Sequence, residues 1–305
     1  MSLLVTSPRP KALPRFRLAT RLATVVCALG LVGTALAGGT GTVSASTAPP
    51  GARSTHLPLE RGRSAPPTGT YSLAPRVLHE VVDVPLRALV SAALARPGAV
   101  RAPEDLPAHN PLLISRGRPQ VVYVGAGFCP YCAAERWALV MALAKFGSFS
   151  GLRATTSSSS DLDPSTPTFS FYGSIFSSKY IGFTPVELYT NQVDKATGSW
   201  QVLQQPTPQQ VSLLEKWDRS PYTSEAGSIP FVYFAGRYVL AGAQYDAGHI
   251  SGWSIARAAA YVTSGKSSTS RNAEAAAGYL VGAFCALTRD MPARVCSVVP
   301  DRLKR

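Results

Sequence analysis

Cysteine and histidine are both scarce in this sequence. Five cysteines and four histidines occur in 305 residues, whereas a metal site built from thiolates and imidazoles needs several of them at short spacings. One Cys-x-x-Cys pair is present, Cys129 and Cys132, and no ligand spacing connects the histidines, which are His56, His79, His109 and His249. We therefore expect no metal and no other cofactor. Half of a zinc site remains an alternative interpretation of the cysteine pair.

Charged residues are also few, at 15% of the chain, and Lys and Arg outnumber Asp and Glu by 30 to 17. A nucleic-acid-binding surface gathers its basic residues in a patch or stripe. Here the basic residues beyond the N-terminus are scattered along the chain. We interpret them as an ordinary solvated surface and expect no nucleic-acid partner.

The N-terminal segment has the pattern of a secretory signal. It contains basic residues without an acid and then an apolar run from Leu22 to Ala37; the basic residues are Arg9, Lys11, Arg15, Arg17 and Arg21. Residues 1–45 are predicted to be a signal peptide that is cleaved before Ser46. A retained signal anchor is the alternative, because uncharged residues 38–43 extend the run toward the roughly 20 residues of a membrane helix. The predicted location is extracytoplasmic, either secreted or anchored to the outer face of the cytoplasmic membrane.

Residues 46–75 are rich in Pro, Ser, Thr, Gly and Arg and have few large apolar side chains, which predicts a disordered linker. Apolar residues at helical spacing over residues 76–95, interrupted by Pro85, then predict an N-terminal helical extension. We expect one folded domain over residues 76–300.

The Cys-x-x-Cys pair lies between a predicted strand and a predicted helix. The β-branched run 121–124 is typical of a buried strand, residues 132–146 favour a helix, and residues 152–156 favour a second strand. This order predicts an α/β fold with a βαβ unit around the cysteines. A long segment at about 157–228 is then predicted to be an insertion, followed by a hairpin over 229–240 and helices at 254–262 and 273–287.

Two cysteines at the start of a helix differ in chemistry. At the helix N-terminus, free N–H groups and the helix dipole stabilise the thiolate of Cys129, which makes it the attacking sulfur. Cys132, one turn later, is predicted to be more buried and to resolve the mixed disulfide. An inert structural disulfide is the alternative. Glu135 and Lys145 on the same helix are candidates for proton handling, or simply part of a solvated face.

The second pair of cysteines, Cys285 and Cys296, surrounds Pro292 near the C-terminus. Because Cys27 lies within the signal segment, the exported chain keeps four cysteines in two close pairs, which suits an oxidising compartment. We expect a structural disulfide between Cys285 and Cys296 that fastens the C-terminal tail. A relay that passes electrons to Cys129 and Cys132 is the alternative.

The sequence resembles an uncharacterised thioredoxin-like family, domain of unknown function 929, over roughly residues 80–300. The resemblance is carried by the segments 125–137, 145–152, 166–172 and 229–231 and by Cys285 and Cys296. An acid and a tyrosine often precede the first cysteine in this family, where this chain has Gly127 and Phe128. That departure argues against acid-assisted proton transfer at the site.

The resemblance implies a thioredoxin-like fold and a cis bond between Ile229 and Pro230, facing Cys129. In thioredoxin-like proteins the residue before this proline offers its backbone to the substrate, so Ile229 and Pro230 are the predicted substrate-binding residues. We expect a thiol-disulfide oxidoreductase that acts on thiols or disulfides of exported proteins together with an unknown redox partner. The alternative is a non-enzymatic thioredoxin-like binding or scaffold module with structural disulfides.

Overall fold

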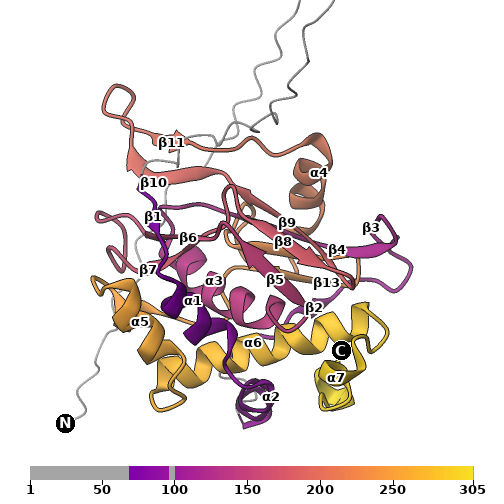
Figure 1. Ribbon diagram of the computed structural model, residues 1–305. Coiled ribbons are helices and arrows are strands. Elements are labelled where there is room, and N and C mark those ends of the chain that lie inside the picture. Colours follow the sequence, from indigo (N-terminus) through magenta and orange to yellow (C-terminus); the bar gives the residue numbers. More distant parts are fainter. Residues whose placement is uncertain (1–68, 96–99, 305) are drawn as a thin grey trace, which may run out of the picture. The chain divides into compact units, whose positions relative to one another are not determined.

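The computed structural model in Figure 1 describes residues 69–95 and 100–304. The predicted signal segment, residues 1–45, and most of the predicted linker lie outside the described residues. Within the described ranges, no helix combines the length and the apolar character needed to cross a membrane.

A mixed sheet of six strands forms the centre of the part that the structure describes. Strand β4 (Arg118–Gly125) pairs in parallel with β9 (Gly182–Glu187) and antiparallel with β12 (Phe231–Phe234). The sheet continues from β12 to β13 (Tyr238–Ala241) and to the short β2 (Glu104–Asp105), while β3 (Ile114–Ser115) forms a hairpin with the start of β4. Strand β4 is therefore interior, which explains its continuous apolar run.

Alternate side chains of the central sheet enter two separate apolar clusters, as the period of two in a strand requires. One face contributes Val121, Tyr123, Val232, Phe234 and Leu240 to the larger cluster. The other face contributes Val122, Val124, Phe231, Tyr233 and Val239 to a smaller cluster that contains Trp217.

Helices cover both faces of the sheet (Figure 1). The larger cluster is formed with α3 (Pro130–Leu143) and α6 (Ser268–Leu287), and with α1 (Pro75–Val82), α2 (Leu86–Ala95) and α5 (Ile255–Val262). The smaller cluster is covered by α4 (Pro208–Trp217). Helices α2 and α6 approach closely at Gly278, where a Cβ atom would lie 2.2 Å from the carbonyl oxygen of Leu89. Short helices η1 (Gly248–Ile250), α7 (Ala293–Cys296) and η2 (Asp301–Leu303) complete the chain.

Three smaller strand groups surround this core. Strands β1 (Tyr71–Ser72), β6 (Arg153–Thr156) and β7 (Pro167–Ser170) form an antiparallel sheet. Strand β5 (Gly147–Ser150) pairs with β8 (Ile175–Ser178), and β10 (Tyr189–Val193) pairs with β11 (Trp200–Val202).

The predicted α/β class is confirmed, as is the break of the N-terminal helices near Pro85, where α1 ends at Val82 and α2 begins at Leu86. The predicted second strand of the βαβ unit is wrong in its pairing. Residues 153–156 form β6, which pairs antiparallel with β1 and β7, whereas the parallel neighbour of β4 is β9. The segment 157–228 therefore contains a strand of the central sheet and is not wholly an insertion.

The predicted C-terminal boundary of the linker, residue 75, lies too far along the chain. Tyr71 pairs with Ala154, and α1 begins at Pro75, so the folded part starts before residue 76. Backbone pairing with β6 orders this polar segment although it contributes little apolar surface.

Candidate functional site

Cys129 is the N-cap residue of α3. Its backbone is extended, with φ −78° and ψ 122°, and Pro130 follows as the first helical residue, a position that suits the fixed φ of proline. The sulfur of Cys129 accepts a hydrogen bond from the backbone N–H of Cys132 at 3.2 Å. The sulfur thus takes the place of the oxygen that caps most helices and faces the positive end of the helix dipole.

The two thiols of the pair have opposite pKa shifts. Cys129 is 4% exposed and Cys132 is fully buried. Burial by itself raises the pKa of Cys129, but hydrogen bonds from the thiol and N–H of Cys132 and the positive charge of Arg136 outweigh it and lower the pKa. Burial, the bond to Cys129 and the charge of that sulfur raise the pKa of Cys132 well above its ordinary value. Of the two thiols, Cys129 therefore loses its proton more readily.

Ile229 lies beside the sulfur of Cys129. The Sγ atom of Cys129 is 3.7 Å from the carbonyl oxygen of Ile229, and the bond between Ile229 and Pro230 is cis. The register of β12 on β4, which pairs Phe231 with Val124, brings the two segments together. The structure therefore places the four residues predicted for exchange and substrate binding at one site.

An aromatic group stands next to the cysteines. The Phe128 ring stacks on Trp200 with 4.6 Å between ring centroids, and Tyr189 lies 6.0 Å from Phe128. Trp200 and Tyr189 come from the β10–β11 hairpin, which closely approaches the turn before Cys129 at Gly127. A Cβ atom on Gly127 would lie 2.9 Å from the backbone nitrogen of Asn191, so an acid at this position would require the hairpin to move.

A buried ion pair lies next to the dithiol and was not among the sequence predictions. Arg136 on α3 donates from Nε to Oε1 of Glu187 at 3.1 Å and from Nη2 to Oε2 at 2.6 Å. Both side chains are at most 2% exposed. The sequence contained one signal, because Arg136 follows Cys132 by four residues on a helix whose other charged residue is Glu135, but nothing local indicated Glu187.

Of the two candidates for proton handling, Glu135 lies on α3 and Lys145 follows the end of this helix. Glu135 is fully buried and accepts a hydrogen bond from the backbone N–H of Gln244 at 3.1 Å. Lys145, just past the end of the helix, donates to the carbonyl oxygens of Val82 and Val84, both at 2.7 Å. Both side chains therefore tie neighbouring segments to α3, and Lys145 does so at the end of the helix opposite the cysteines.

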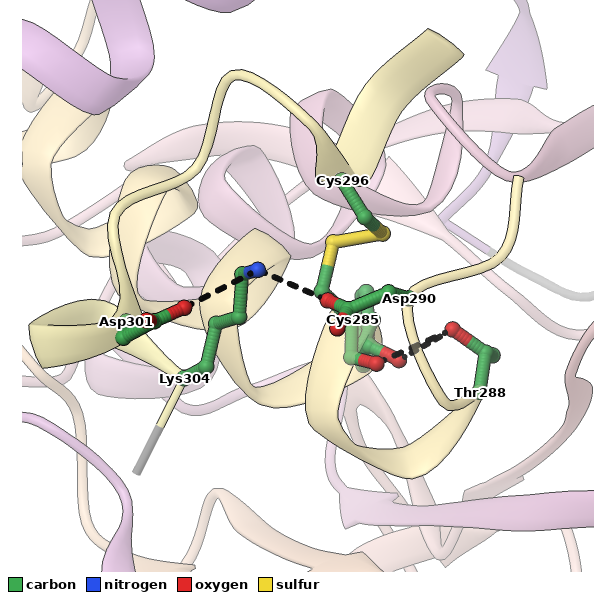
Figure 2. The surroundings of a disulfide bond; sticks show 7 residues. Cys285, Thr288, Asp290, Cys296, Asp301 and Lys304 are labelled. Carbon is green, nitrogen blue, oxygen red and sulfur yellow. Dashed lines mark hydrogen bonds and ion pairs between the residues drawn. A yellow bond between two sulfur atoms is a disulfide. The ribbon is translucent and has the colours of Figure 1, made fainter. Parts of the chain in front are cut away.

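A disulfide joins Cys285 at the end of α6 to Cys296 in α7 (Figure 2). Beside it, Lys304 forms ion pairs with Asp290 at 2.8 Å and with Asp301 at 3.3 Å, so the C-terminal tail is held at several points. Phe284 packs against Phe146, with ring centroids 5.4 Å apart. Phe146 follows the C-terminal end of α3, and the 14 residues of that helix span about 20 Å. The two cysteine pairs thus lie at opposite ends of α3, which favours the structural role over an electron relay.

Among the described residues, no group of three or more His, Cys, Asp or Glu side chains is placed to hold a metal ion. In the comparisons with known proteins, residues 107–277 match a family model described as a domain of unknown function (DUF929). No curated protein and no solved structure matches the chain. The matched region is more than half of the sequence and contains the cysteine pair, Ile229 and both members of the buried ion pair, and we conclude that the chain belongs to the DUF929 family.

Proposed function

We propose that this protein catalyses thiol-disulfide exchange on exported proteins, with Cys129 as the exchanging sulfur and Cys132 as the resolving sulfur. The observation that carries the proposal is the asymmetry of the pair. One sulfur caps a helix and has a lowered pKa, while the other is fully buried one turn later with a raised pKa. A structural disulfide has no need of this difference, whereas exchange requires one sulfur to react first.

A thioredoxin-like fold is part of the proposal. Strand β4, helix α3 and the parallel strand β9 are followed by the antiparallel pair β12 and β13 and then by α6, with the strands in the order β9, β4, β12, β13. A Cys-x-x-Cys turn between the first strand and the first helix of such a βαβ unit is typical of thioredoxin-like redox proteins. The strand order therefore supports this assignment.

Exchange proceeds through a mixed disulfide between Cys129 and a sulfur of the other protein. We propose that Ile229 holds that partner, and the proposal is supported by its backbone, which borders the Cys129 sulfur two residues before the interior strand β12. Cys132 then attacks Cys129 and releases the partner with a free thiol, while Cys129 and Cys132 become a disulfide. The reverse sequence oxidises a partner. The proposed place of action is outside the cytoplasmic membrane, and it rests on the signal pattern of residues 1–45.

Single cysteine variants test these roles. With a disulfide-containing protein as substrate, Cys132→Ser is expected to accumulate a mixed disulfide through Cys129, because no resolving thiol remains. Cys129→Ser is expected to form none and to have no turnover. Peptide masses identify the linked cysteine, and the Cys285→Ser/Cys296→Ser double variant serves as a control that keeps the site intact. Equal trapping by both single variants, or by neither, would contradict the assigned roles. A folded wild-type protein without turnover in either direction would favour the binding module instead.

A further inference from the structure

The guanidinium group of Arg136 is fixed inside the protein. Its side chain is 1% exposed and is held by Glu187 through two hydrogen bonds. Burial has the largest single effect and lowers the pKa of Arg136, but the charge of Glu187, its hydrogen bonds and smaller contributions from Tyr123 and Cys132 together raise the pKa above its ordinary value, so the group stays protonated. The Nη1 atom has no hydrogen-bond partner among the described residues. Glu187 therefore binds the Nε and Nη2 side of the guanidinium group and leaves Nη1 without a hydrogen bond.

This cation is connected directly to the active-site turn. Nη2 of Arg136 donates to the carbonyl oxygen of Ala126 at 2.9 Å, and the N–H of Cys129 donates to the same oxygen at 3.4 Å. Residues four apart on a helix share one face, so Arg136 lies on the same face of α3 as Cys132, one turn closer to the C-terminal end of the helix. The guanidinium group is thus bonded to the turn that carries the exchanging sulfur.

The groups that face Arg136 come from three elements. Glu187 lies on β9 and the cysteines on α3, and the ring of Tyr123 on β4 lies 5.7 Å from the guanidinium carbon. Burial raises the pKa of Tyr123 well above its ordinary value, which Arg136 only partly offsets, so the phenol is neutral. Beside Glu187 and this neutral phenol, the charge of Arg136 acts on the two sulfurs.

We propose that Arg136, held by Glu187, is a positioning residue that stabilises the Cys129 thiolate of the dithiol form and thereby makes the Cys129–Cys132 disulfide an oxidant for the thiols of exported proteins. This rests on the proposed function and adds to it a direction of electron flow. A disulfide is a stronger oxidant when its reduced form is stabilised, and a thiolate that is more stable is also a better leaving group.

The reaction balances as follows. A substrate thiolate attacks Cys129, the bond between Cys129 and Cys132 breaks, and Cys132 leaves and takes up a proton. The second substrate thiol, after losing its proton, attacks the substrate sulfur of the mixed disulfide and expels Cys129 as the thiolate. The substrate loses two electrons and two protons and gains a disulfide. The protein gains two electrons and one proton, the other proton enters the solvent, and a small-molecule disulfide such as oxidised glutathione restores the starting state.

The test compares the full chain with variants of the ion pair. Arg136→Met/Glu187→Gln removes both charges and retains similar volume, a change that buried ion pairs often tolerate. Arg136→Lys keeps the positive charge. The matched control is Arg237→Met, which removes an arginine that bonds the carbonyl of Ala108 at the hairpin end away from Pro230. Each protein is equilibrated with reduced and oxidised glutathione, and the redox state of the peptide that contains Cys129 is read by mass after alkylation. The pH dependence of Cys129 alkylation gives its pKa.

In the double variant, we expect the equilibrium constant for oxidation of glutathione to fall at least tenfold, which is about 30 mV for a two-electron couple, and the pKa of Cys129 to rise. Arg136→Lys should stay within threefold of the wild type, and Arg237→Met should not differ from it. A double variant within twofold of the wild type, or a lysine variant that falls as far as the double variant, would overturn the proposal.

If the double variant does not fold, the single variant Glu187→Gln tests the role of Arg136 instead. The charge of Arg136 is then no longer offset, so the equilibrium constant is expected to rise, and an unchanged or lower value refutes the proposal. This equilibrium needs no protein substrate. Shifted constants without turnover would therefore refute the proposed function alone, and turnover with unshifted constants would refute the role of Arg136 alone.

Discussion

Replacement of Glu135 by glutamine is expected to change how the stability of the fold depends on pH. Glu135 is fully buried on α3, and one of its oxygens accepts a hydrogen bond from the N–H of Gln244. The other oxygen, Oε1, has no hydrogen-bond partner among the described residues. Burial raises the pKa of this carboxyl from 4.5 to about 7, against the opposing effects of the Gln244 N–H and the charge of Arg101.

The sign follows from the number of protons bound in each state. Between pH 4.5 and about 7 the folded state holds a proton on Glu135 that the unfolded state has lost. The free energy of unfolding therefore decreases as the pH rises through this window and is constant, as far as Glu135 is concerned, on either side of it. Each pKa unit corresponds to about 1.4 kcal/mol, so the whole window amounts to about 3 kcal/mol.

Urea unfolding of the wild type and Glu135→Gln between pH 4 and pH 8 measures this contribution. The wild type should lose about 3 kcal/mol more than the variant over this range. The slope is the quantity to compare, because a buried amide without a partner costs about 1–3 kcal/mol at every pH. Burial also raises the pKa of Asp218 to about 7, but its effect is common to both proteins and cancels.

Glu215→Gln is the matched control for this measurement, since Glu215 is an exposed glutamate on another helix, α4. It should reproduce the pH slope of the wild type. If Glu135→Gln and the wild type have the same slope, the carboxyl of Glu135 is not a buried group that titrates near neutrality, and the reasoning fails.

Three further substitutions separate stability from exchange. The double variant Cys285→Ser/Cys296→Ser removes a loop closure that stabilises the fold by about 3 kcal/mol. It should lower Tm by roughly 6–12 °C and leave exchange at Cys129 intact. An unchanged Tm with lost turnover would indicate an electron relay. Gly127→Ala brings a Cβ atom to 2.9 Å from the backbone of the β10–β11 hairpin. It should lower the free energy of unfolding, measured in urea, by about 1–3 kcal/mol. An unchanged free energy of unfolding would mean that the hairpin moves freely. Lys145→Met leaves two carbonyl groups without their donor and should cost about 1–3 kcal/mol without slowing exchange, whereas slower exchange at full stability would restore Lys145 as a proton carrier.

The local elements and the position of the cysteines could be predicted because each depends on neighbouring residues. The β-branched run before the cysteines forms an interior strand, and the helix begins at Pro130, two residues before its predicted start at residue 132. Pro85 separates two helices for the same local reason. The placement of Cys129 at a helix N-terminus, and with it the chemistry of its sulfur, follows from this local order.

The parallel partner of β4 could not be predicted in this way. Strand β9 contains Pro185, which argues against a central strand because proline cannot donate to the ladder. Among the strands that the structure describes, β9 pairs only with β4. It is therefore an edge strand and tolerates the proline. Residues 153–156 have the better strand composition but belong to a different sheet. Composition identifies a strand, whereas the choice of partner depends on contacts between residues far apart in the sequence.

The ion pair of Arg136 and Glu187 shows why a buried charge is difficult to infer from sequence and informative once found. An arginine on a helix usually belongs to a solvated face, and its acid is 51 residues away. In the fold both side chains are buried, and at buried positions well-packed hydrophobic residues often give stability equal to or greater than that of an ion pair. Stability alone therefore does not account for two charges at this position. A fixed cation bonded to the turn that carries Cys129 has an electrostatic effect on its sulfur that no apolar pair would supply. For this reason the redox equilibrium of the cysteine pair is the more informative measurement of what the ion pair does.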